Sequence, residues 1–235
     1  MTVSFDMDGE VALVTGVSGA LGSAVAEAFL DAGATVCGAD ITAPGEDGFL
    51  FDEPDRIDFH QGDFTDERVV VDVLESVVET HGGLDSMAAI AGTWRGGDPV
   101  DETDVETFDF LFGVNLKTTF LAAKHALPHL RERSGSIVTV SSRSSLEGGS
   151  GDALYRASKA GVRLLTESID AENDAVRANA VLPSVIDTPM NREMMPDADH
   201  AAWTDPAEIA SVVLFLSSDA AAPTSGAAVP VYGDA

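Results

Sequence analysis

The stretch VALVTGVSGALGSAVAEAFLDAGA, from Val11 to Ala34, decides the fold. Its first five residues are a short apolar run typical of buried parallel strands, and a helical apolar pattern follows directly. Gly16, Gly19 and Gly22 lie between the two. Small residues at such a turn let the backbone approach a pyrophosphate, which the unpaired N–H groups of the following helix attract. The stretch therefore predicts a strand, a phosphate-binding turn and a helix.

The same alternation continues along the chain and indicates the fold class. Apolar runs of strand type recur at residues 34–40, 56–60, 85–90, 136–142, 176–182 and 228–232. Helical patterns lie between them at residues 68–80, 103–131, 153–173 and 206–217, and the second is interrupted near Gly113 to Asn115. At 235 residues and 45% hydrophobic, the chain suits one large α/β domain. We expect residues 1–235 to form a doubly wound parallel sheet of the Rossmann type, with helices on both faces.

Asp40 ends the second apolar run, about twenty residues beyond the glycines. An acid at this place in a dinucleotide-binding fold accepts hydrogen bonds from the adenosine ribose and repels a 2′-phosphate. Asp40 therefore predicts NAD as the preferred cofactor, with NADP as the alternative. The other interpretation is a solvated loop acid in an acidic protein.

The candidate chemistry lies in SIVTVSSRSSLEGGSGDALYRASK, residues 136–159. In a helix that starts near Ala153, Tyr155 and Lys159 stand one turn apart on the same face. A cation beside a phenol stabilises the phenolate and lowers a tyrosine pKa from about 10, which makes the phenol a usable general acid or base. Ser142 ends the preceding strand run, where its hydroxyl can hold a substrate oxygen. These residues predict a carbonyl-reducing site; the alternative is a chance pairing on one helix.

This region resembles the short-chain dehydrogenase/reductase family, whose YxxxK motif and upstream serine are matched by Tyr155, Lys159 and Ser142. The resemblance covers nearly the whole chain. It implies hydride transfer between nicotinamide C4 and a substrate carbon, with Tyr155 exchanging the proton and Ser142 holding the oxygen. It also implies that Lys159 lowers the pKa of Tyr155 and orients the ribose. Asn115, in GVNLKTTF, would bend its helix and hold a water that passes protons to the lysine.

The resemblance further implies a set of cofactor-binding positions, with three departures from the family pattern. Ala20 replaces the middle glycine of the first turn, Ile90 replaces the second asparagine of NNAG, and Ser184 replaces the glycine of PGxxxT. The implied positions are Gly16, Ser18, Gly19, Ala20, Leu21, Gly22, Asp40, Asp63, Phe64, Ala91, Gly92, Tyr155, Lys159, Pro183, Ile186 and Thr188.

Two resemblances compete over the substrate. Residues 186–203 and AGTWRGG from Ala91 are similar to dihydropteridine reductases, whereas most of the chain looks like reductases of 3-oxoacyl thioesters and related alcohol dehydrogenases. Because Ser142 and Asn115 are present, we expect a small carbonyl or alcohol substrate. The alternatives are dihydropteridine reduction, 3-oxoacyl thioester reduction and a sensor that binds dinucleotide without turnover. Residues 191–203 are a candidate lid, and the candidate pocket walls are Trp94, Met194, Met195 and Trp203. The loop at 93–98 is placed to present Trp94 and Arg95 over a substrate; the alternative is that both are ordinary loop residues.

Composition narrows the partners and the compartment. With a formal charge of −27 and only 13 lysines and arginines, the chain is poorly suited to nucleic acid. The sequence has no apolar run of about 18 residues, and its first ten residues are acidic, so we expect no membrane partner and a cytoplasmic location. Pairing through the helices at 103–131 and 153–173, common in the family, implies a homodimer or homotetramer.

No metal site is expected from the sequence. Cys37 is the single cysteine and lies in the apolar run TVCGA, so we interpret it as a core residue. His125 and His129 have the i, i+4 spacing of metal ligands but lack the glutamate of HExxH. They are expected to be a surface pair.

The charge of −27 predicts a salt-adapted protein. At molar salt the Debye length falls to about 3 Å, so repulsion between the scattered carboxylates is screened. The melting temperature should therefore rise as potassium chloride is raised towards molar concentrations. A melting temperature that does not rise with salt would contradict this expectation.

Overall fold

The computed structural model describes residues 5–233 and contains a seven-stranded parallel sheet in the order β3-β2-β1-β4-β5-β6-β7. Because β1 pairs with both β2 and β4, the strand order reverses there, and ligands bind at the carboxyl ends of strands beside such a reversal. The Rossmann-type fold is confirmed. The strands are β1 Val11–Thr15, β2 Thr35–Asp40, β3 Asp58–Gln61, β4 Ser86–Ala89, β5 Ser136–Val140, β6 Arg177–Pro183 and β7 Ala228–Val231.

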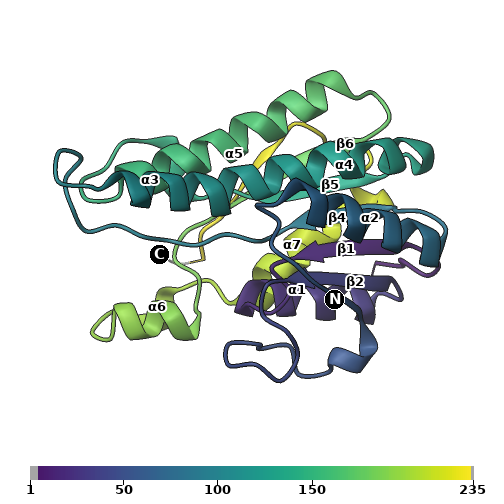
Figure 1. Ribbon diagram of the computed structural model, residues 1–235, viewed down its shortest axis with the longest axis horizontal. Helices are drawn as coiled ribbons and strands as arrows, with labels where there is room; N and C mark the ends of the chain where they lie inside the picture. Colours follow the sequence, from purple (N-terminus) through teal and green to yellow (C-terminus); the bar gives the residue numbers. More distant parts are fainter. Residues whose placement is uncertain (1–4, 234–235) are drawn as a thin grey trace.

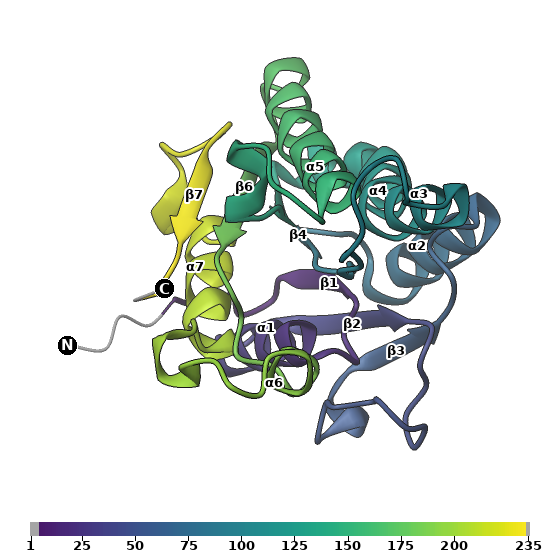
Figure 2. The same cartoon turned by 90° about the vertical axis from the view of Figure 1, so that its left-hand side faces the viewer.

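Helices cover both faces of the sheet (Figure 1). The helices are α1 Ala20–Asp31, α2 Glu67–His81, α3 Val105–Leu111, α4 Thr118–Arg133, α5 Ala153–Glu172, α6 Pro189–Met194 and α7 Pro206–Ser217. Figure 2 shows α1 and α7 on one face of the sheet and α2, α4 and α5 on the other. Two apolar clusters match this division, one containing Val14 and Phe29 and the other containing Leu13 and Leu74. Neighbouring residues of β1 thus face opposite layers, as the strand period of two requires.

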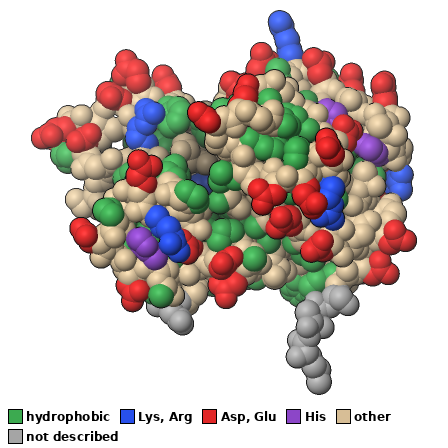
Figure 3. Space-filling view, turned by 90° about the horizontal axis from the view of Figure 1, so that it is seen from below, with side chains coloured by type: hydrophobic (Ala, Val, Ile, Leu, Met, Phe, Trp, Pro, Cys, Tyr) green, Lys and Arg blue, Asp and Glu red, His purple; other side chains and the backbone are tan. Residues whose placement is uncertain are grey.

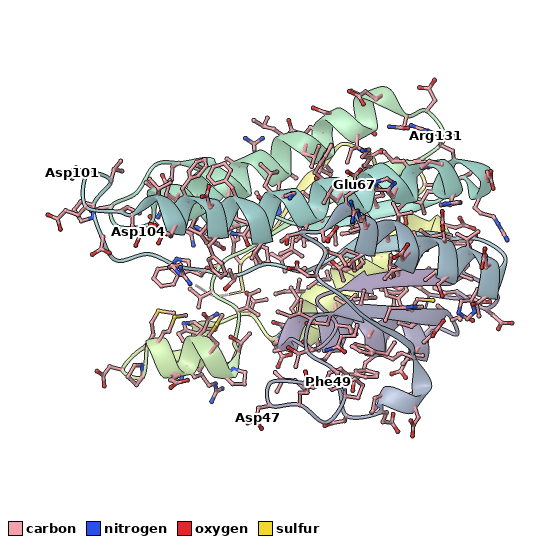
Figure 4. The ribbon with its side chains drawn as sticks, in the orientation of Figure 1. Asp47, Phe49, Glu67, Asp101, Asp104 and Arg131 are labelled. Atoms are coloured by element: carbon pink, nitrogen blue, oxygen red, sulfur yellow. The ribbon has the colours of Figure 1, made fainter. Side chains whose placement is uncertain are left out.

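The long helical region divides where the sequence indicated an interruption. Residues Phe112–Lys117 form a π-helix between α3 and α4, and Asn115 lies inside it. The hydroxyls of Thr118 and Thr119 donate to the carbonyl oxygens of Val114 and Asn115, at 2.6 and 2.9 Å. Asp104 caps α3 by accepting from the backbone N–H of Thr107 at 2.6 Å, and Figure 4 shows it at the start of that helix. The whole region therefore continues from α3 into α4 with one local bulge.

Other boundaries differ from expectation for local reasons. The strand expected from Arg56 starts at Asp58, because Pro54–Arg56 forms a 3-10 turn in which the N–H of Arg56 donates to the carbonyl of Glu53. Asp205 caps α7 and completes a capping box with Glu208. Over residues 5–233, the helices lack the combination of length and apolar character that crossing a bilayer requires. Acidic side chains are scattered over the face shown in Figure 3.

Candidate functional site

A cavity of about 1690 Å³ opens at the carboxyl ends of the central strands. Every expected cofactor position lines it, from the glycine turn to Thr188, and so does Ser142. Residues that are far apart in the sequence therefore meet at the point where the strand order reverses. Asn115 is fully buried and lies behind the wall.

The turn after β1 leaves no room for side chains at two of its glycines. Gly16 has a φ of +72°, and a Cβ on it would lie 2.8 Å from the backbone of Ala91. A Cβ on Gly22 would lie 1.9 Å from the carbonyl oxygen of Gly16. Gly19 is less constrained, with its nearest neighbour at 3.6 Å, and Ala20 begins α1 without disturbing the turn. The departure at Ala20 is therefore compatible with this turn geometry.

Thr15 ties the two central strands together at this edge. Its Oγ1 accepts from the backbone N–H groups of Ile90 and Ala91, at 3.1 and 3.2 Å. The Ile90 side chain makes no such bond, so the threonine hydroxyl holds the end of β4 from the other strand. Thr15 was not identified as a site residue from the sequence, although a threonine between a strand and a glycine turn was a usable signal.

Two acids lie at neighbouring strand ends. Asp40 accepts from the backbone N–H of Ser18 at 3.0 Å and from that of Thr42 at 3.1 Å. Asp63 accepts from the N–H of Thr65 at 2.8 Å. Asp40 therefore lies beside the glycine turn, where a ligand on that turn would meet its charge.

Ser142 and Tyr155 face each other on the cavity wall. Burial raises the pKa of Tyr155, while a hydrogen bond from Ser142 lowers it. The Ser142 oxygen also accepts from the N–H of Ser144 at 3.1 Å, which orients the hydroxyl. The phenol is therefore protonated at neutral pH and is hydrogen-bonded to the residue expected to hold the substrate oxygen.

Lys159 is 4% exposed, and its Nζ donates to the carbonyl of Val140 at 2.9 Å. Burial lowers its pKa to about 8. Desolvation of the phenol by burial is the largest influence on the pKa of Tyr155 and raises it, while the contact with Ser142 lowers it. A lowering of that pKa by Lys159 stays a prediction. Gly92 leaves the necessary room, since a Cβ there would lie 2.8 Å from Nζ.

Asn115 acts as a cross-link inside the protein. Its Oδ1 accepts from the N–H of Thr93 at 2.7 Å, and its Nδ2 donates to the carbonyl of Thr93 and to the hydroxyl of Ser158, each at 3.0 Å. Ser158 in turn donates to the carbonyl of Tyr155 at 2.8 Å. The chain of bonds fixes the loop after β4 against the first turns of α5. Ser158, which the sequence analysis missed, is the polar neighbour of Lys159 in the quoted YRASK motif.

The expected pocket walls are partly correct. Trp94, Met194 and Met195 line the cavity, and all are partly exposed. Trp203 lies outside it, with its ring 4.4 Å from that of His200. Arg95 does not line the cavity, but its guanidinium lies 4.0 Å from the ring centroid of Phe110, which does.

Further lining residues were not identified from the sequence. Among them are Phe110, Arg143 and Met190, and Arg143 has its guanidinium 5.0 Å from the ring of Tyr232. Thr188 caps α6 by accepting from the N–H of Asn191 at 3.2 Å. The segment expected as a lid thus contains the end of α6 and a 3-10 turn, His200–Ala202, and its methionines border the cavity.

Comparison with known proteins identifies the family. The short chain dehydrogenase family profile matches residues 10–199. The chain is 32% identical to a 3-oxoacyl-[acyl-carrier-protein] reductase of Thermotoga maritima, over 97% of this chain and 98% of the relative. It is 33% identical to the meso-2,3-butanediol dehydrogenase of Serratia marcescens, over 97% and 95%. The crystal structure of carveol dehydrogenase from Mycobacterium avium in complex with NAD superposes with a TM-score of 0.89 at 26% identity, covering 98% of each chain.

These relatives have different substrates by name at almost the same identity, so they favour none of the alternative functions over a general carbonyl or alcohol oxidoreductase. The match over residues 10–199, together with a parallel sheet whose cavity brings the YxxxK residues to the glycine turn, is sufficient for assignment. The chain belongs to the short-chain dehydrogenase/reductase family.

Proposed function

We propose that the protein interconverts a small carbonyl compound and its alcohol, with Tyr155 as the general acid and base and NAD(H) as the preferred cofactor. The observation that carries the proposal is that Ser142 and Tyr155 lie together on the wall of the cavity that the glycine turn also lines. A hydroxyl pair of this kind can hold a carbonyl oxygen and deliver a proton to it.

The residues present fit a dinucleotide. The backbone cradle at Gly16 and Gly22, which a Cβ would fill, is suited to a pyrophosphate at the start of α1. When bound, the nicotinamide supplies or accepts the hydride. Pro183, Ile186 and Thr188 would hold the nicotinamide end, and Asp63 and Phe64 the adenine end.

The remaining chemistry belongs to the chain itself. In reduction, Ser142 donates a hydrogen bond to the substrate oxygen, and Tyr155 gives that oxygen its proton as the carbonyl carbon receives hydride. A tyrosine phenol is protonated at neutral pH, and burial raises its pKa further, so reduction starts from the correct protonation state. Oxidation of an alcohol requires the phenolate, so it should be favoured at higher pH. Lys159 supplies positive charge beside the site, and Asn115 holds the loop and helix that position both residues.

The preference for NAD(H) is supported by Asp40. Its carboxylate lies against the Ser18 N–H of the glycine turn, where a 2′-phosphate would bring a second negative charge. The carveol dehydrogenase that superposes on this chain is in complex with NAD, which is consistent with this preference.

An apolar surface supports assembly of the protein with itself. Phe112, Leu116, Phe120 and Leu165 line a shallow groove between the π-helix, α4 and α5, and Phe120 is 46% exposed. We therefore propose a homodimer or homotetramer that pairs through α4 and α5. We also propose that residues 1–235 form one domain and that the protein works in the cytoplasm.

The substitution Tyr155→Phe tests the proposed acid. It removes one oxygen and little packing, so kcat for a carbonyl substrate should fall by about 10²- to 10⁴-fold while NADH affinity, measured by fluorescence titration, stays nearly constant. Tyr232→Phe is the matched control and should retain activity. If Tyr155→Phe keeps more than a few per cent of wild-type kcat, another acid acts.

The substitution Asp40→Asn tests cofactor choice, because it removes the charge and keeps an acceptor for the Ser18 N–H. The wild type should show kcat/KM for NADH roughly tenfold or more above that for NADPH, and the variant should narrow the ratio. Asp47→Ala, a substitution in an exposed loop, should leave the ratio of the two kcat/KM values unchanged. Equal kcat/KM values for both cofactors in the wild type would remove Asp40 from this role.

The buried ammonium of Lys159 should lower the free energy of unfolding of the protein. Its pKa is about 8 in the folded protein, against 10.5 for a lysine in water, so the unfolded chain holds the proton more tightly. The destabilisation is complete below about pH 8 and disappears as pH rises to 10.5. Lys159→Met should therefore lose activity yet unfold with a free energy higher by about 1 to 3 kcal/mol at pH 7, an advantage that shrinks as the pH approaches the ordinary lysine pKa.

Lys124→Met is the control for this measurement, because Lys124 is half-exposed and paired with Glu67. It should bring no gain in the free energy of unfolding. The free energies of unfolding of wild type, Lys159→Met and Lys124→Met are compared by denaturant unfolding between about pH 7 and pH 10.5. A Lys159→Met protein that is less stable than wild type at pH 7 would show that the ammonium stabilises the fold.

A further inference from the structure

A second cluster of reactive side chains lies away from the cavity, where β2, β3 and the end of α2 meet. Cys37 is in the middle of β2 and pairs in register with Asp58, the first residue of β3, while His81 is the last residue of α2. One sulfur, oxygen or nitrogen from each of the three lies within 4.8 Å of the others. None of these residues lines the cavity described above.

His60 adds a fourth group to this cluster. It lies two residues beyond Asp58 on the same face of β3, and its Nε2 is 3.3 Å from Asp58 Oδ2. The Nε2 of His81 is 2.8 Å from the same oxygen. This His60 nitrogen is buried, and although it lies near Asp58 Oδ2, it makes no hydrogen bond to any atom of residues 5–233. Two imidazole nitrogens therefore converge on one carboxylate oxygen beside a thiol.

The donor set has a recognisable metal preference. One cysteine sulfur, two histidine nitrogens and one aspartate oxygen are donors of the kinds that Zn²⁺ binds, whereas Mg²⁺ and Ca²⁺ take oxygen ligands. Cys37 is fully buried in the apolar cluster that also holds Val77 and Leu84. The side chain of Asp58 is 35% exposed and that of His81 is 20% exposed, so an ion can enter from solvent.

From this geometry we propose that Cys37, Asp58 and His81 bind one Zn²⁺, with His60 as the fourth ligand. Binding forms a zinc–sulfur bond and breaks the sulfur–hydrogen bond of Cys37, and the proton leaves to solvent. The ion replaces the direct contacts between Asp58 and the two histidines. It joins the edge strand β3 to β2 and to α2, so it stabilises the free edge of the sheet.

No metal was expected here from the sequence, for a definite reason. The four residues occupy positions 37, 58, 60 and 81, a spacing that matches no short ligand motif, and Cys37 alone pointed to a core residue. The parallel pairing of β2 with β3 and the return of α2 along them bring the four together.

The test uses the full chain, dialysed against EDTA and titrated with Co²⁺ as a spectroscopic probe. Wild type should bind one equivalent with a thiolate-to-cobalt charge-transfer band, and Zn²⁺ should displace the probe. Cys37→Ser should abolish the band, and His81→Gln should weaken Co²⁺ binding by at least about tenfold, since even outer-shell changes cost that much. Zn²⁺ should raise the melting temperature of wild type and have little effect on His81→Gln.

His125→Gln is the matched control, because His125 belongs to a separate surface cluster in which its Nε2 lies 2.9 Å from Glu67 Oε1; Figure 4 labels Glu67 at the start of α2. This variant should bind Co²⁺ as wild type does. Circular dichroism shows whether each variant folds. If Cys37→Ser fails to fold, Co²⁺ binding by His81→Gln, a change at a partly exposed residue, tests the proposal. Absence of a thiolate band in wild type, binding unchanged in His81→Gln, or binding lost in His125→Gln would overturn the proposal. The first two results would leave the cluster as a hydrogen-bonded network only, and the third would place the bound ion elsewhere.

Discussion

The close backbone approach at the reversal of strand order is the constraint on which the rest of the structure depends. A Cβ on Gly22 would lie 1.9 Å from the carbonyl oxygen of Gly16, and one on Gly16 would touch the backbone of Ala91. The start of α1, the end of β1 and the end of β4 therefore meet with only backbone between them, and the hydroxyl of Thr15 fixes the contact. The cavity exists because these strand ends diverge from that point.

The reactive residues are held from the other side by α5. Ser141 donates to the carbonyl of Lys159 at 2.8 Å, and Asn115 reaches Ser158 from the π-helix. Both contacts fix the first turns of α5 against β5 and against the loop after β4. The buried ammonium of Lys159 is unfavourable for stability, because burial removes its charge from water. An apolar residue at this position would pack without that cost, so the chain retains a charge that its stability does not need. That is the pattern expected of a functional site.

The sequence was sufficient for the fold because its signals were local and agreed with one another. Apolar runs, helical patterns and a glycine turn predicted the order of elements, and Tyr155 and Lys159 on one helix turn predicted the reactive pair. What could not be predicted depended on side-chain direction. Trp203 packs on His200, Lys159 turns to the carbonyl of Val140, and Cys37 meets Asp58 and His81 only through strand register. Neither hydropathy nor spacing carries that information.

The central claim is that a dinucleotide turn and a Ser–Tyr pair in one cavity make a carbonyl-reducing enzyme. A panel of small aldehydes, ketones and alcohols, supplied with reduced or oxidised nicotinamide cofactors at high potassium chloride, tests it most directly. We predict that nicotinamide absorbance will change with at least one small carbonyl or alcohol, and faster with NAD(H) than with NADP(H). Tight dinucleotide binding without turnover of any compound in either direction would contradict the account.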